Sequence, residues 1–153
     1  MAIFKFKLKA LHRLKKQIED QEKNKFSLAA AELNAEVAKL NNIKSSIAAA
    51  VGEFRRLSGE RFTAAKIKDF NYYIAAMKEN EARQTTVVEA ALKKIEEARK
   101  TLTIASQQRA MFDKLQEKAF MRYMIEERLA EQRIVDELVS YRGNNRTEQY
   151  MLG

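Results

Sequence analysis

The chain has no cysteine, no proline and no tryptophan, and only four of its 153 residues are glycine. Without cysteine it has neither disulfides nor thiolate metal ligands. Proline and glycine most often end helices and form turns, so their scarcity argues against a fold of short strands and hairpins. No stretch approaches the roughly eighteen uncharged apolar residues of a membrane-spanning helix, so no span is expected. These absences favour long, uninterrupted helices.

A seven-residue apolar repeat runs from Ile67 to Phe112 and predicts a coiled-coil helix. One seam position holds Ile67, Ile74, Glu81, Val88, Ile95, Leu102 and Arg109, and the other holds Phe70, Met77, Gln84, Ala91, Ala98, Ala105 and Phe112. An earlier series places Phe26, Leu33, Leu40, Ile47 and Phe54 at intervals of seven. Such spacing keeps one narrow stripe of each helix facing a partner helix. Between Ile18 and Phe26 the apolar step is eight, which predicts a slip of register.

Ser58-Gly59 is the only turn-like dipeptide between the two series. The sequence therefore predicts an all-α fold in which two long helices form an antiparallel coiled-coil hairpin. We expect one domain, 1–153, with helix one at about 4–57, a turn at 58–61, helix two at about 62–142 and a loose tail at 143–153. Thr63 is the expected N-cap of helix two, and Gly143 its expected end.

Helix two is the longer helix and should extend beyond helix one. If Leu57 packs near Phe62, Phe4 lies opposite Leu115, and residues 117–142 have no partner. The apolar side chains of this overhang are unfavourable in water on a single helix. The overhang therefore needs a binding partner.

The charge pattern leaves several kinds of partner open. The chain has a net charge of +8, and residues 1–25 carry eight basic side chains against three acidic ones. A solvated helix face, an acidic protein rim and nucleic acid are the alternatives, and no nucleic-acid-binding motif accompanies the charge. His12, the only histidine, is expected to be an ordinary surface residue. We expect no enzyme, cofactor or metal site, since no ligand set or phosphate loop is present.

Two segments carry short motifs: the opening Phe4-Lys5-Phe6-Lys7-Leu8, and the segment from Phe112 through Tyr123 to Leu138. The first is similar to the Phe-x-Phe-x-Leu start of the flagellar export protein FliJ family, and the second is similar to the ending of that family. The resemblance implies a cytoplasmic, non-enzymatic stalk of the flagellar type III export apparatus, associated peripherally with the inner membrane. Its implied partners are the export ATPase hexamer, the cytoplasmic domain of the export gate membrane protein, and export chaperones.

The resemblance also implies where these partners bind. The joined termini would enter the ATPase ring, and the residues assigned there are Lys5, Lys7, Lys9, Phe120, Tyr123, Met124, Ile134 and Leu138. The gate contact would use an aromatic–aliphatic stripe early in helix two, made of Phe70, Tyr73, Met77, Asn80 and Gln84. The alternatives are a stalk of virulence type III secretion or of a rotary ATPase, and a basic coiled coil that binds nucleic acid.

Overall fold

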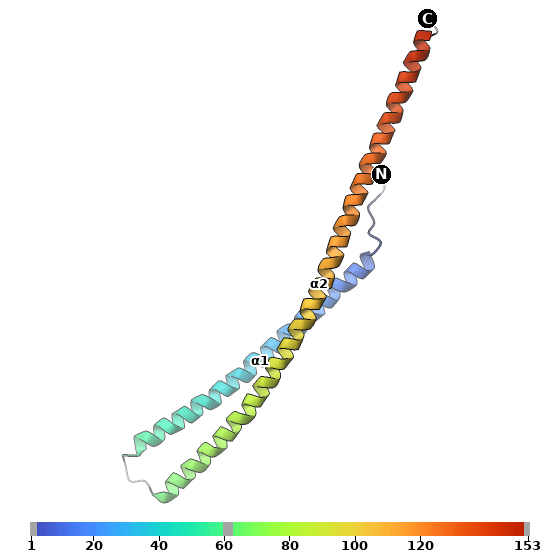
Figure 1. Cartoon of the computed structure of the whole chain (residues 1–153). Coiled ribbons are helices and arrows are strands. Elements are labelled where there is room, and N and C mark those ends of the chain that lie inside the picture. Colours follow the sequence, from blue (N-terminus) through green and yellow to red (C-terminus); the bar gives the residue numbers. More distant parts are fainter. Residues whose placement is uncertain (1–2, 60–62, 152–153) are drawn as a thin grey trace. The chain divides into compact units, whose positions relative to one another are not determined.

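The computed structural model describes residues 3–59 and 63–151, which form two long helices (Figure 1). Helix α1 covers Lys9–Leu57 and helix α2 covers Ala64–Met151, with lengths of 49 and 88 residues. The described ranges contain no strand. Phe54, near the end of α1, stacks on Phe70, near the start of α2, so the helices pack antiparallel there. The predicted all-α fold of two long packed helices is confirmed.

Helix α1 begins later than predicted. Residues 3–6 form no regular element, and the backbone N–H of Lys9 donates to the carbonyl of Phe6 across 3.1 Å in the turn that precedes the helix. The predicted start at residue 4 was therefore wrong. The physical reason is a tertiary contact, because the non-helical segment lets the Phe4 ring reach Phe120 and Tyr123 on α2.

The start of α2 agrees with its predicted cap. The backbone N–H of Lys66 donates to the Thr63 hydroxyl across 3.3 Å, which is the hydrogen bond expected of an N-cap. Ser58 closes α1, and its hydroxyl donates to the carbonyl of Arg55. Residues 60 and 61 of the predicted turn, and the predicted helix start at Phe62, lie outside the described residues.

The end of α2 differs from the prediction. The helix continues through Gly143 to Met151, so neither a stop at residue 142 nor a loose tail over 143–151 is present. Gly143 does not adopt a positive φ, the conformation through which glycine usually terminates a helix. Glycine within a helix costs only about 1 kcal/mol relative to alanine. This cost lowers the stability of the helix but does not prevent it from continuing. The Thr147 hydroxyl donates to the Gly143 carbonyl within this last part.

The contacts group into two compact units. The central unit is Ile18–Ser106, and the terminal unit combines Met1–Gln17 with Gln107–Gly153. In the central unit the most buried apolar residues, Leu40, Val88, Ala91 and Ala105, all belong to the predicted seams. Ile67, predicted in the seam, is 41% exposed, so close packing begins one turn later, at Phe70. A single domain over 1–153 stays a prediction.

One seam position of the central unit, Gln84, is polar, and its side-chain amide has hydrogen-bond partners. The Gln84 side-chain amide donates to the carbonyl of Glu36 across 2.9 Å and to its carboxylate across 2.6 Å. The hydrogen bond from Gln84, followed by one from Lys39, lowers the pKa of the Glu36 carboxyl. The amide thus keeps its hydrogen bonds although Met77 and Val88 on either side of it in the seam are apolar.

Candidate interaction surfaces

The N-terminal segment of the terminal unit lies against α2. The Phe4 ring lies 5.2 Å from Phe120, edge to face, and 5.4 Å from Tyr123, measured between ring centroids. Phe4 was predicted opposite Leu115, so the expected register was wrong by more than one helical turn. The prediction assumed that Leu57 faces Phe62, whereas Phe54 in fact packs on Phe70 and shifts the pairing toward later residues of α2.

The structure also overturns the prediction for His12, which is only 4% exposed. Its Nε2 lies 2.5 Å from Oδ1 of Asp113, and Arg109 donates to Oδ2 of the same carboxylate across 2.6 Å. The imidazole is stacked near Phe112, with 6.3 Å between ring centroids. A polar ring can be buried here because Asp113 provides a hydrogen-bond partner.

The burial of His12 follows the seven-residue repeat without a slip. Counting back from Phe26 in steps of seven gives Glu19 and His12, and these are the two buried polar residues of α1, 6% and 4% exposed. Leu11, an apolar neighbour that suggested a different register, is 41% exposed. The predicted slip between Ile18 and Phe26 was therefore wrong, because the repeat continues through polar residues.

Acid should weaken the terminal unit through Asp113. The hydrogen bond from His12, and then the one from Arg109, hold the pKa of the Asp113 carboxyl below its ordinary value. A lowered native pKa contributes stability above the unfolded pKa, and this contribution is lost as pH falls through the native pKa. We expect Asp113→Asn to unfold more easily at neutral pH and to lose less further stability on acidification. Urea unfolding followed by circular dichroism over a pH series measures both effects.

Asp136→Asn is the matched control, since Asp136 is an exposed aspartate on the same helix. An Asp113 variant with the same acid dependence as the wild type would show that the contacts of His12 and Arg109 do not stabilise the charged carboxylate.

The residues predicted for the ATPase contact all belong to the terminal unit. Lys5, Lys7 and Lys9 are exposed on the N-terminal segment and at the start of α1. Phe120, Met124, Ile134 and Leu138 are 46%, 45%, 58% and 57% exposed on α2. Tyr123 is half-buried and contacts Phe4, so it packs against the N-terminal segment and offers less of its surface to a binding partner.

The N-terminal segment covers α2 farther along than predicted. A groove of about 750 Å³ between them is lined by Ile3, Phe4, Lys5, Phe6, Lys7 and Leu8 and by Ala119, Arg122, Tyr123 and Glu126. The overhang of α2 therefore begins near Glu126 and not at residue 117. Residues 131–151 are all exposed, and Ile134, Val135, Leu138, Val139 and Tyr141 are the large apolar side chains between residues 131 and 141.

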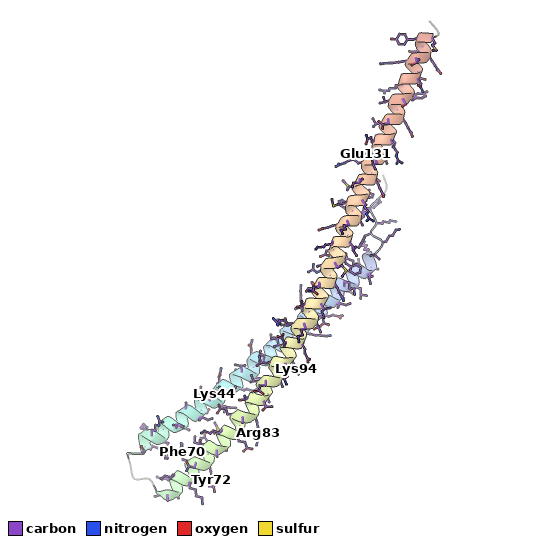
Figure 2. The ribbon with its side chains drawn as sticks, in the orientation of Figure 1. Lys44, Phe70, Tyr72, Arg83, Lys94 and Glu131 are labelled. Atoms are coloured by element: carbon purple, nitrogen blue, oxygen red, sulfur yellow. The ribbon has the colours of Figure 1, made fainter. Side chains whose placement is uncertain are left out.

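The residues predicted for the gate contact divide into two groups. Phe70 stacks on Phe54 with 4.0 Å between ring centroids, and Met77 and Gln84 are half-buried in the seam. Tyr73 is 50% exposed and Asn80 is exposed. Figure 2 shows Phe70 on the side of α2 that faces α1. Of this group, therefore, only Tyr73 and Asn80 are exposed and can contact a partner.

Tyr72, the neighbour of Tyr73 in the sequence, is also exposed. Figure 2 shows Tyr72 near the start of α2, where it is 65% exposed. The Lys68 ammonium lies 5.9 Å from the centre of the Tyr72 ring. Both tyrosines of the pair are thus exposed. Together, Tyr72 and Tyr73 give the start of α2 an accessible aromatic surface that suits protein contact.

Within the described residues there is no group of histidine, cysteine and acidic side chains able to hold a metal ion. Neither described helix is long and apolar enough to cross a membrane. Two long helices with a narrow seam and exposed apolar faces define a coiled-coil protein.

The family described as Flagellar FliJ protein matches residues 4–148, nearly the whole chain. The chain belongs to this family, which is a non-catalytic component of flagellar protein export. No match was found among curated proteins or among solved structures.

Proposed function

We propose that the chain is the central stalk of the flagellar export apparatus, which binds and stimulates the hexameric export ATPase and couples it to the export gate. The observation that carries this proposal is the exposed apolar surface of α2 in the terminal unit. Phe120, Met124, Ile134 and Leu138 expose between 45% and 58% of their surface. Apolar surface of this extent on a single helix is typical of a protein-binding site.

The charge beside this surface supports the same partner. Residues 3–16 include six basic side chains and no acidic one, and Lys5, Lys7 and Lys9 are exposed. Positive charge beside the exposed apolar side chains of α2 fits an ATPase ring whose entrance is acidic. This charge should accelerate association more than it tightens the complex. In this proposal the chain also binds export chaperones and is held at the inner membrane through its protein partners.

The direct test is the addition of the purified chain to the cognate export ATPase. We expect the chain to be retained with the ATPase on a sizing column and to raise its rate of ATP hydrolysis. An ATPase that neither retains the chain nor changes its rate would contradict the stalk function.

The gate contact is assigned to Tyr73 and Asn80. We expect Tyr73→Ala to weaken binding to the cytoplasmic domain of the gate and to reduce motility, with little change in melting temperature, since half of the side chain is exposed. Binding titrations and motility assays measure the effect. Tyr72→Ala is the control, because Tyr72 is its equally aromatic and more exposed neighbour. Equal losses from both variants would remove the assignment to Tyr73.

A further inference from the structure

Two faces of α2 in the terminal unit carry the same pattern with opposite charge. The basic face consists of Met111, Leu115, Lys118, Arg122, Ile125 and Leu129. The acidic face consists of Phe120, Met124, Glu127, Glu131, Ile134 and Leu138. Along the helix, each face has two apolar residues, then two charged residues, then two apolar residues. Successive members of a face are alternately four and three residues apart in the sequence. Each face therefore has the residue spacing of a coiled-coil seam.

Both faces are at least partly exposed and point in different directions, although Phe120 contacts Phe4 and Arg122 borders the N-terminal segment. Corresponding members are nine residues apart, about two and a half helical turns, so the faces lie on nearly opposite sides of the helix. The apolar members of the two faces are between 40% and 58% exposed. Lys118, Arg122 and Glu131 are exposed, and Glu127 is half-buried.

We propose that the basic face binds the acidic face of a second copy of this chain. The equal spacing lets each residue of one face meet one residue of the other. Lys118 and Arg122 then lie against the glutamates of the second copy, with two apolar layers on each side. The contact extends over about 27 Å of helix, and because each pattern is symmetric about its centre, it forms in either helix direction.

The like charges within each face favour a second copy over other occupants. Lys118 and Arg122 are one helical turn apart, as are Glu127 and Glu131, and such pairs repel each other on an isolated helix. A neighbouring chain supplies opposite charges at the matching spacing and relieves both repulsions. Few unrelated surfaces would provide two charges and four apolar side chains in this order.

The contact joins two different faces, so in a pair of copies one acidic face and one basic face remain free. Further copies can bind to these free faces in the same way. The contact also covers Phe120, Met124, Ile134 and Leu138. If the proposed function is correct, a chain whose acidic face is occupied cannot use these residues on the ATPase. Self-association itself does not depend on that function.

A charge-exchange experiment tests the contact. Sedimentation equilibrium of the full chain should show self-association that increases with concentration and weakens with salt. Lys118→Glu with Arg122→Glu, and separately Glu127→Lys with Glu131→Lys, should each weaken self-association by at least about tenfold, because two like-charged faces then meet. An equimolar mixture of the two variants should associate again, since each supplies the charge that the other lacks.

Lys44→Glu with Lys93→Glu is the matched control for Lys118→Glu with Arg122→Glu, because it makes the same change in net charge at exposed lysines of the central unit. Circular dichroism verifies that all variants remain helical. A wild-type chain that stays monomeric at every concentration would overturn the proposal. A mixture that fails to associate, or a control that weakens association equally, would also overturn it.

Discussion

Met124→Asp combined with Leu138→Asp should abolish stimulation of the export ATPase while the chain stays helical. Both side chains are about half exposed on the same face of α2, so the substitutions remove no core packing. Burying such a side chain in a complex contributes about 1.5–3 kcal/mol, and aspartate replaces that gain with a desolvation cost. Two losses together predict binding more than about a hundredfold weaker. ATPase rates against chain concentration measure the effect.

Ile125→Asp with Leu129→Asp is the control, since these residues are similarly exposed on the other side of the same helix. This variant should keep most of the stimulation. An equal loss in both variants would show that the ATPase contact is not confined to the face of Met124 and Leu138.

Ala91→Asp should cause the largest loss of stability of any substitution considered. Ala91 is 2% exposed in the seam of the central unit, so an aspartate there places a charge between the helices without space for water. We expect the free energy of unfolding to fall by about 2–5 kcal/mol. Urea unfolding followed by circular dichroism measures the change.

Ala90→Asp separates burial from helix propensity. Ala90 is exposed next to Ala91, and aspartate disfavours the helix equally at both positions. Its loss of stability should stay below about 1 kcal/mol. Similar losses at the two positions would mean that the seam is not closely packed at Ala91.

The fold could be predicted because the seven-residue repeat is a direct consequence of helix packing. Leu40, Val88, Ala91 and Ala105 are buried where the repeat places them. The repeat was misread where it passes through polar residues, because His12 is buried only by virtue of Asp113, which is 101 positions away in the sequence. The end of α2 was missed because glycine lowers helix stability without requiring a stop.

The candidate sites were only partly predictable. The sequence indicates that α2 is longer than α1, and hence that an apolar surface needs a partner. It does not reveal that the N-terminal segment leaves the helix at Lys9 and covers Tyr123, which decides which side chains stay free. In the early part of α2, Phe70 and Gln84 could not be separated from Tyr73 without knowing the contacts with Phe54 and Glu36.

The hydrogen bonds of Gln84 have a consequence for the alignment of the two helices. Sliding α1 along α2 by seven residues would bring one apolar layer opposite another, so hydrophobic packing alone hardly distinguishes the two arrangements. After such a slide, Gln84 would face Ala29 or Ile43, neither of which has a side-chain acceptor for its amide. A buried polar group without a partner costs about 1–3 kcal/mol. The alanines and valines of the seam hold the helices together, and the polar pair selects one alignment among several of similar strength.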